Sequence, residues 1–406
     1  MCRPVGLEDM FCAQRSLCGF YKTDEGMEQL TRLAEGRKRK RLAILVNQLT
    51  PYRLPLYGIL ADNLDVLVMH GGMERNRNWA LNIPESLRTH KVWTFQIPMW
   101  KRTGVEGVKD RIYVHLNIGL LWCLPRFRPD IIVTVEMGLR TVFAVLYGKL
   151  MRVPVWVWWG GTLHSERNVS QGRRRLRRWM VRNVRRWISY GATSTEYLES
   201  IGARREEILQ IQNCVPQETF THEPSESKKW FEGLPRPVLL CVGQLIERKG
   251  AGLFVDACGR AAERGEQFSV VLVGSGPEKD SLCKLAEQYG LKNFEILPNQ
   301  SQETLNEMYR TADVFVFPTL EDVWGLVVNE AMWAGIPVLC SQLAGCAKEL
   351  LPESCTFYPT SPESFDAALD RALTGKLPPP DRARLLTWQQ VGDLLVESLE
   401  SGVPIR

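Results

Sequence analysis

Two series of short apolar runs, separated by a polar stretch, constrain the fold of this 406-residue chain most strongly. In the first series each run is followed by a turn and then by helical patterning, as in RLAILVN, DVLVMHG, DIIVTVE, VPVWVWWGG and RWISYGAT. Apolar runs that alternate with helices predict a parallel sheet of βα units, buried on both faces. The rhythm restarts with PVLLCVG, FSVVLVG, NFEILPN, DVFVFPT, IPVLCSQ and CTFYPT, which predict a second parallel sheet.

We therefore predict an α/β protein with two doubly wound, Rossmann-like domains that face each other across a cleft. The predicted parts are an N-terminal extension (1–39), a first domain (40–215), a linker rich in Pro, Ser and charge (216–236), a second domain (237–385) and a C-terminal amphipathic helix (386–406). Open α/β sheets bind ligands at the carboxyl ends of their strands, so the cleft is the predicted site.

Composition narrows the class of protein. A net charge of +5 is too weak, by itself, to indicate a nucleic-acid-binding protein. The eleven cysteines include no C-x-x-C pair, which favours buried reduced thiols over disulfides or zinc. The first residues lack the sustained apolar region of a signal peptide, and the apolar runs are shorter than the roughly 20 residues of a membrane span. These features predict a soluble, cytoplasmic protein.

The stretch FPTLEDVWGLVVNEAMWAGIPVLCS, residues 317–341, carries the most specific pattern. A buried strand ends at Pro318, and a helix is expected to begin near Gly325 and to end at Gly335. Asp322 then lies on the loop and Glu330 lies about two turns into the helix. Free amides at a helix start bind anions, and carboxylates accept hydrogen bonds from sugar hydroxyls. The pattern therefore indicates a nucleotide sugar, with a capping acid beside an exposed Glu as the structural alternative.

Two further stretches of the second domain weaken that alternative. CVGQLIERKGAGLFVDA places Lys249 and Gly250 in a loop that follows a strand and opens a helix. VVLVGSGPEKD follows the next strand with a glycine turn that begins at Gly274. Together they place a cationic loop, a glycine loop and an acid-flanked helix start at the carboxyl edge of one sheet.

These motifs resemble those of retaining glycosyltransferases of the GT-B fold, family 4. The resemblance rests on VGQLIERKG, VLVGSGPE, YRTADVFVFPT and EDVWGLVVNEAMWAGIPVL, in that order. The N-terminal half matches more loosely, through TPYRLPLYGIL, WWGGTLHSE and YLESIGA, and the family's Gly-Gly loop after the first strand is replaced by NQLTPYR. The resemblance covers roughly residues 40–402 and implies that the C-terminal helix crosses back to the first domain.

The resemblance implies roles for the acidic and basic residues of the second domain. Glu330 matches the acid that holds the donor ribose, and Lys249 matches the Lys that neutralises the leaving diphosphate. Asp322 stands where the family usually has Glu, beside the transferred sugar, and Glu321 is the alternative because Asp is one methylene shorter. Gln244 stands where the family often has Arg, and Arg248 is the candidate replacement for that charge.

Other positions follow from the same resemblance. The amides of Gly325, Leu326 and Val327 and the loop at Gly274 are expected on the donor phosphates, and backbone near Pro298 on the base. His164 is expected to line the sugar site. Arg53 is expected on the acceptor side, in contact with an anionic or sugar group, although a surface helix-start residue is the alternative.

The implied activity is transfer of a sugar from a nucleotide sugar to a glycan or lipid-linked acceptor, with retention and without metal or other cofactor. Polysaccharide or glycolipid biosynthesis is the implied setting. Because Asp322 and Gln244 depart from the family's usual Glu and Arg, a catalytically degenerate partner protein is an alternative. A nucleotide-sugar epimerase is a further alternative.

The stretch GRRRLRRWMVRNVRRW, residues 172–187, carries eight Arg and no acid. It predicts either a surface helix whose apolar side packs on the first sheet, or a basic amphipathic helix on the anionic inner face of a membrane. A nucleic-acid patch is disfavoured because no binding motif accompanies it.

Overall fold

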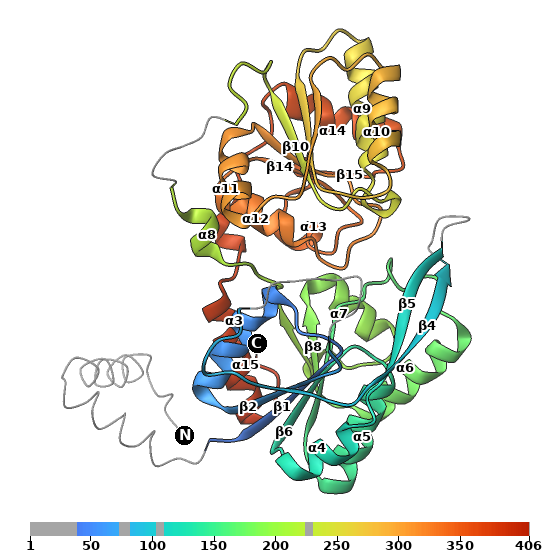
Figure 1. The fold of residues 1–406 in the computed structure, drawn as a ribbon, viewed down its shortest axis with the longest axis vertical. Coiled ribbons are helices and arrows are strands. Elements are labelled where there is room, and N and C mark those ends of the chain that lie inside the picture. The colour runs from blue at the N-terminus through green and yellow to red at the C-terminus, as the bar shows by residue number, and fades with distance from the viewer. Residues whose placement is uncertain (1–38, 73–81, 103–108, 224–229, 406) are drawn as a thin grey trace, which may run out of the picture. The chain divides into compact units, whose positions relative to one another are not determined.

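The computed structural model describes residues 39–72, 82–102, 109–223 and 230–405, and two parallel sheets organise them (Figure 1). The first sheet has the strand order β3-β2-β1-β6-β7-β8-β9, with every neighbouring pair parallel. Its strands are β1 Arg41–Val46, β2 Asp65–His70, β3 Arg88–Lys91, β6 Ile131–Val135, β7 Val155–Trp159, β8 Trp187–Tyr190 and β9 Ile208–Ile211.

Helices cover both faces of this sheet because its strands are apolar on both sides. In β7, Trp156 and Trp158 pack in the hydrophobic cluster that includes α3, whereas Val157 and Trp159 pack in a second cluster with α6 and α7. The helices of this half are α3 Leu54–Asn63, α4 Leu120–Phe127, α5 Leu139–Met151, α6 Gln171–Asn183 and α7 Gly191–Ser200, with the 3-10 turns η1 Pro51–Arg53 and η2 Arg205–Glu207.

The second sheet has the order β12-β11-β10-β13-β14-β15 and is also parallel throughout. Its strands are β10 Val238–Val242, β11 Ser269–Val273, β12 Phe294–Leu297, β13 Val314–Phe317, β14 Val338–Ser341 and β15 Thr356–Phe357. The accompanying elements are η3 Glu247–Lys249, α9 Ala251–Glu263, α10 Lys279–Gln288, α11 Gln302–Thr311, α12 Leu326–Ala334, α13 Ala347–Leu350, η4 Glu353–Cys355 and α14 Pro362–Leu373. All eleven predicted strands are present, and the prediction of two Rossmann-like parallel sheets is confirmed.

Three features were not predicted from the sequence. Strands β3 and β9 extend the first sheet at its two edges, and β4 Phe95–Arg102 pairs with β5 Lys109–Leu116 in an antiparallel hairpin. A short helix, α8 Gln217–Thr221, lies inside the predicted linker, where Phe220 is buried against Tyr309 of α11. The predicted part boundaries themselves stay predictions, and residues 1–38 of the predicted extension lie outside the described residues.

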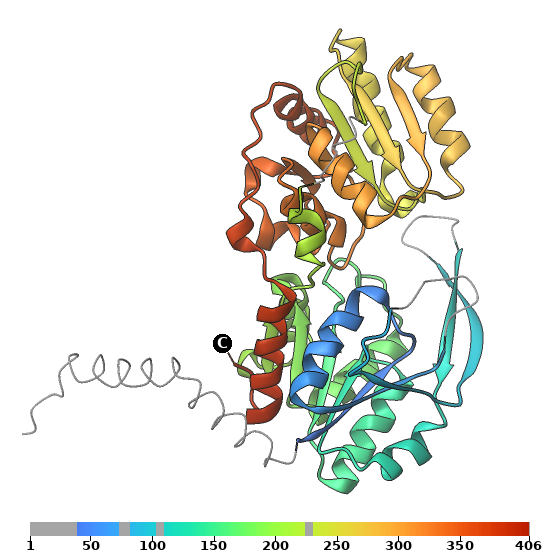
Figure 2. The ribbon, with the colours of Figure 1, turned by 60° about the vertical axis from the view of Figure 1, so that its left-hand side comes forward.

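The C-terminal helix, α15 Trp388–Ser401, follows the 3-10 turn η5 Arg382–Arg384 and packs on α3 of the first half (Figure 2). A Thr387–Gln390 capping box fixes its start. The approach is close: a Cβ built on Gly392 would lie 2.5 Å from Ile59 Cγ2. The crossing implied by the resemblance is therefore present. No helix of the described ranges has the length and apolarity needed to cross a bilayer.

Candidate functional site

The candidate site is built on the loop that joins β13 to α12. Helix α12 begins after Gly325 and ends at Gly335, two glycines with φ values of 106° and 94°, so both predicted ends are confirmed. Trp324 anchors the loop because its buried indole donates to Asn329 Oδ1 at 2.8 Å. Asp322 is held by a bond from the Gly345 amide to its carbonyl at 3.0 Å. The loop therefore presents Asp322 from a fixed backbone.

Lys249 and Asp322 form an ion pair at this edge of the sheet. Lys249 Nζ lies 2.5 Å from Asp322 Oδ2, and both side chains are largely buried. The other carboxylate oxygen accepts from the Trp324 amide at 3.2 Å. Arg248 strengthens the junction: its Nη1 donates to the Glu321 carbonyl at 2.6 Å, and its own carbonyl accepts from the Leu320 amide. Two motifs 73 residues apart thus form one polar cluster.

Gly250 allows Lys249 to take its place. Its φ is 70°, and a Cβ there would lie 2.1 Å from the Pro318 carbonyl oxygen. We expect Gly250→Ala to lower the free energy of unfolding by about 2 kcal/mol or more, because left-handed strain costs of order 1–3 kcal/mol before the clash is counted. The matched control is Gly252→Ala in α9, where nothing lies within 4 Å. The control should gain roughly 0.5–1 kcal/mol. Urea unfolding measures both, and equal stability of the two variants would refute the close approach.

Glu330 lies on the second turn of α12 and is 9% exposed. Tyr309 of α11 donates its hydroxyl to Glu330 Oε2 at 3.0 Å. Burial raises the pKa of Glu330 to about 7, against the lowering effect of the Tyr309 hydrogen bond. Ionising the Glu330 carboxyl therefore costs free energy. Its oxygens can still accept hydrogen bonds from a ligand hydroxyl.

A loop of the first half contacts the same cluster. His164 Nε2 lies 2.8 Å from the Leu320 carbonyl oxygen, and Arg167 Nη1 lies 2.6 Å from Glu321 Oε2. His164 therefore contacts the backbone of the β13–α12 loop two residues before Asp322. Arg167 binds the Glu321 carboxylate, so Asp322 is the acid paired with Lys249.

The remaining predicted donor residues lie along the same strand edge. Gln244 and Lys249 line a small hollow together with Gly243 and Pro318. At Gly274 the backbone approach is very close, because a Cβ would lie 1.8 Å from the Gly243 carbonyl oxygen. The Gly274 amide donates to the carbonyl of Leu297 at 2.9 Å, which places Pro298 beside the glycine turn. These residues therefore lie along one strand edge, and their roles in donor binding stay predictions.

Sequence reasoning missed three contributors: Arg167, Tyr309 and Trp324. Tyr309 begins the YRTADVFVFPT stretch already singled out, and Arg167 lies three residues after His164, so position gave a weak signal for both. Arg53 lies at the carboxyl ends of the strands of the first sheet, over the rings of Trp158 and Tyr190. No group of three or more His, Cys, Asp or Glu able to hold a metal occurs in the described part of the chain.

The arginine-rich stretch has its apolar side inside the protein. Helix α6 spans only Gln171–Asn183, and Trp187 is a buried residue of β8. Trp179 packs against the second cluster, and Arg177 is buried beside Glu166, over the Trp159 ring at 4.9 Å. The apolar face of α6 therefore packs on the sheet, which is the first of the two alternatives predicted for this stretch. Contact of its basic face with a membrane stays a prediction.

Residues 223–385 match the family model described as Glycosyl transferases group 1. This match covers the second sheet and its cluster of Lys249, Asp322 and Glu330. An uncharacterized glycosyltransferase of Methanocaldococcus jannaschii is 33% identical over 140 residues, covering 34% of this chain and 36% of the relative. The GPI3 subunit of the phosphatidylinositol N-acetylglucosaminyltransferase of Saccharomyces cerevisiae is 24% identical over 227 residues, covering 55% of this chain and 46% of the relative. The chain thus spans less than half the length of these curated relatives.

Solved structures match over more of the chain. HepE of Anabaena, in complex with UDP and glucose, has a TM-score of 0.61 and 17% identity and covers 89% of this chain and 95% of its own. WaaG, a glycosyltransferase involved in lipopolysaccharide biosynthesis, has a TM-score of 0.57 and 15% identity, with coverage of 89% and 98%. These likenesses establish the GT-B fold, and the family match supports a group 1 glycosyltransferase.

Proposed function

We propose that this protein transfers a sugar from a nucleoside diphosphate sugar to an acceptor hydroxyl, with retention of the anomeric configuration. The observation that carries the proposal is the Lys249–Asp322 pair beside the start of α12, with Glu330 on the next turn of that helix. A cation and free helix amides suit a diphosphate, and two carboxylates suit the hydroxyls of a ribose and a hexose.

The proposed chemistry breaks the bond between the anomeric carbon and the diphosphate oxygen, which leaves with the bonding electrons. Lys249 and the amides of 325–327 stabilise the developing phosphate charge. Asp322 pairs with the Lys249 ammonium group in the free protein, and its proposed role with donor bound is to accept hydrogen bonds from the sugar hydroxyls. The acceptor hydroxyl attacks from the side of the leaving group, which takes the hydroxyl proton, so no metal is required.

The first test is a panel of UDP-, GDP- and ADP-sugars in EDTA, without acceptor, with thermal stability and nucleotide release measured together. We expect one sugar nucleotide to stabilise the wild type and to be slowly hydrolysed, and Glu330→Ala to lose both effects. HepE, whose structure holds UDP and glucose, makes UDP-glucose the first donor to try. Binding without release, even with sugar and lipid acceptors, would favour a degenerate partner. Absence of binding by every donor would refute the site.

The proposed acceptor is a glycan or a lipid-linked sugar, and one curated relative supports the lipid setting. It is the GPI3 subunit of the phosphatidylinositol N-acetylglucosaminyltransferase. We propose that the protein works at the inner face of an anionic membrane in polysaccharide or glycolipid biosynthesis.

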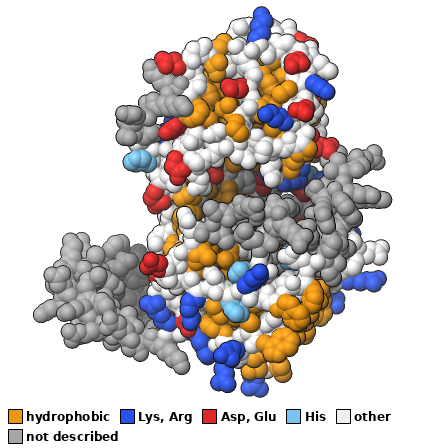
Figure 3. Space-filling model, in the orientation of Figure 1, with side chains coloured by type: hydrophobic (Ala, Val, Ile, Leu, Met, Phe, Trp, Pro, Cys, Tyr) orange, Lys and Arg blue, Asp and Glu red, His pale blue; other side chains and the backbone are white. Residues whose placement is uncertain are grey.

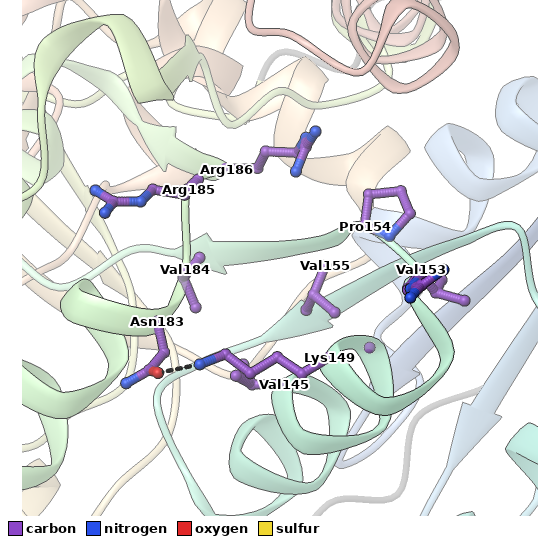
Figure 4. Close-up of a pocket in the computed structure, with 11 residues that line it drawn as sticks. Val145, Lys149, Val153, Pro154, Val155, Asn183, Val184, Arg185 and Arg186 are labelled. Carbon is purple, nitrogen blue, oxygen red and sulfur yellow. Dashed lines mark hydrogen bonds between the residues drawn. The ribbon is translucent and has the colours of Figure 1, made fainter.

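The surface over α5 and α6 supports membrane contact without insertion of α6. The solvent side of α6 carries five exposed arginines, Arg173, Arg174, Arg175, Arg178 and Arg182. Helix α5 lies alongside, since Lys149 donates to Asn183, and it exposes Leu146, Leu150 and Met151. Figure 3 shows hydrophobic side chains gathered over α4 and α5 with basic ones at their border. Between α5 and α6 lies a hollow of about 340 Å³, lined by Lys149, Arg152, Arg185 and Arg186 among others (Figure 4).

We expect the triple variant Arg174→Gln, Arg178→Gln, Arg182→Gln to bind phosphatidylglycerol vesicles roughly 100-fold more weakly, because each basic residue near such a surface contributes about 1 kcal/mol. Vesicle co-sedimentation measures this, and binding should fall with added salt. The control removes three exposed lysines of the second half, with Lys284→Gln, Lys292→Gln and Lys376→Gln together. An equal loss in both triples would assign the effect to net charge and refute this surface.

A further inference from the structure

Arg53 is enclosed by aromatic rings at the carboxyl edge of the first sheet. It ends η1, which follows β1, and its guanidinium carbon lies 5.4 Å from the ring centroid of Trp158, 5.5 Å from that of Tyr190 and 5.7 Å from that of Tyr52. Trp158 belongs to β7 and Tyr190 ends β8, so the cage is built where these neighbouring strands end. This is the edge at which open α/β sheets bind ligands.

Several polar atoms of this cage are buried without a hydrogen-bond partner. Among the described residues this holds for Arg53 Nε, the Tyr190 hydroxyl and the indole nitrogen of Trp158. The Tyr57 hydroxyl interacts with the Arg53 guanidinium and still has its own proton to donate. Two atoms on the loop between β1 and η1, Gln48 Oε1 and Thr50 Oγ1, are also buried without a hydrogen-bond partner. No carboxylate forms an ion pair with Arg53 within the described ranges. The unpaired groups are thus mostly donors, and the fixed charge among them is positive.

A purely structural cage does not account for this arrangement. Cation–π contacts contribute roughly 0.5–2 kcal/mol. Each buried polar group left unpaired costs about 1–3 kcal/mol, and three such donors occur here. In the ligand-free protein the free-energy cost of the unpaired donors therefore exceeds the gain from the cation–π contacts. Arg140 lies nearby: burial, together with the smaller effect of the Arg53 charge, lowers its pKa to about 10, against the raising effect of Glu136.

We propose that Arg53 and the Tyr57, Tyr190 and Trp158 donors form a subsite for an oxyanion of the acceptor, so that the acceptor is a sugar bearing a carboxylate or a phosphate. An arginine fork binds either group through two parallel hydrogen bonds, and the phenols and the indole supply further donors. Gln48 Oε1 accepts from a sugar hydroxyl. That the ligand is the acceptor sugar rests on the proposed function, whereas the oxyanion site rests on the cage itself.

The cage adjoins the candidate reaction centre through packed residues. Tyr190 is followed by Gly191, where a Cβ would lie 2.5 Å from a ring atom of Trp324. The Trp324 amide in turn donates to Asp322. On the other side Tyr190 packs against Gly160, at the start of the loop that carries His164. An acceptor anchored at Arg53 therefore has its remaining hydroxyls near the facing loops of the donor site.

The test compares glucose, glucuronic acid and glucose 6-phosphate, which share a ring and differ in the group at one carbon. Calorimetry on the full chain with saturating UDP should show one or both anions binding roughly 10- to 150-fold more tightly than glucose, the range for hydrogen bonds to charged groups. Arg53→Gln should abolish the preference, and Arg53→Lys should retain part of it. Arg264→Gln, at an exposed arginine that follows α9, is the matched control and should leave the preference intact.

Tyr190→Phe guards against a trivial folding defect. Because the Tyr190 hydroxyl lacks a partner in the free protein, its removal should raise the melting temperature while it weakens anion binding several-fold. A merely structural hydroxyl would give the opposite change in melting temperature. Equal affinities for the three sugars, no measurable binding of any, or a preference that survives Arg53→Gln would each overturn the subsite. Failure of the wild type to bind any nucleotide would instead refute the proposed function, and the sugar comparison without UDP would still test the subsite.

Discussion

Replacing Lys249 with alanine should slow nucleotide release from the donor sugar by roughly 100- to 1,000-fold, the usual loss when one group that stabilises a developing oxyanion is removed. Lys249 lies 2.5 Å from Asp322 in the ligand-free protein, so its ammonium group is already held at the site. The diphosphate gains negative charge as the glycosidic bond breaks, and Lys249 is the cation that pairs with Asp322 on the loop before α12. The loss should therefore appear in the rate of release more than in donor affinity.

Lys292→Ala, which removes an exposed lysine of the same half, is the control and should leave the rate unchanged. Single-turnover release of nucleotide at saturating donor separates the two effects. The double variant Lys249→Ala, Asp322→Ala reports whether the pair acts as a unit, since coupled residues give losses that do not add. A Lys249→Ala rate within threefold of the wild type would remove this lysine from the proposed chemistry.

Glu330→Gln should stabilise the free protein and weaken the donor complex. Because burial raises the pKa of Glu330 to about 7, the folded state holds this proton more tightly than the unfolded chain, whose Glu has a pKa of roughly 4.3. Its contribution to stability is therefore greatest below about pH 4 and is lost as pH rises to about 7. The gain from Glu330→Gln should thus be roughly 2–3 kcal/mol larger at pH 8 than at pH 5.

Donor binding has the opposite pH dependence. A carboxylate that accepts from ribose hydroxyls binds best when ionised, so wild-type donor affinity should fall as pH drops below about 7, by up to tenfold per unit. Glu330→Gln should lose roughly 10- to 100-fold in affinity at pH 8 and should show a flat profile. Urea unfolding and donor titration at both pH values measure this, with Glu287→Gln on the exposed side of α10 as the control. A stability gain independent of pH would contradict the buried carboxyl.

The sequence predicted those features that local chemistry determines. Gly325 and Gly335 delimit α12 because left-handed backbone at both ends leaves few other residues possible, and the apolar runs predicted both sheets. Two of the outer strands were not predicted. Strand β3 has the polar sequence RTHK, and β4 contains Pro98, which argues against a strand. The RTHK segment lacks the apolar signal that marked the central strands, and Pro98 interrupts that signal in β4.

Pairings across long separations were beyond sequence reasoning. Arg167 and Glu321 are 154 residues apart, and the Tyr309–Glu330 bond joins two different helices. The sequence alone does not show which acidic residue lies beside an arginine in the folded chain. The amphipathic pattern of α6 was equally ambiguous, since an apolar stripe looks the same whether it packs on a sheet or on lipid. The burial of Met180 and Val181 in the second cluster shows that this stripe packs on the sheet.

The buried carboxyl of Glu330 has a consequence for how such proteins diverge. A single nucleotide substitution converts a Glu codon into a Gln codon, and here that change is expected to relieve the fold while it disables the donor site. Mutations that stabilise at the expense of activity are readily found in natural proteins. A lineage released from selection for transfer could therefore lose this activity and keep a sound fold. Inactive descendants with intact sheets should be common, and Gln at this position would mark them.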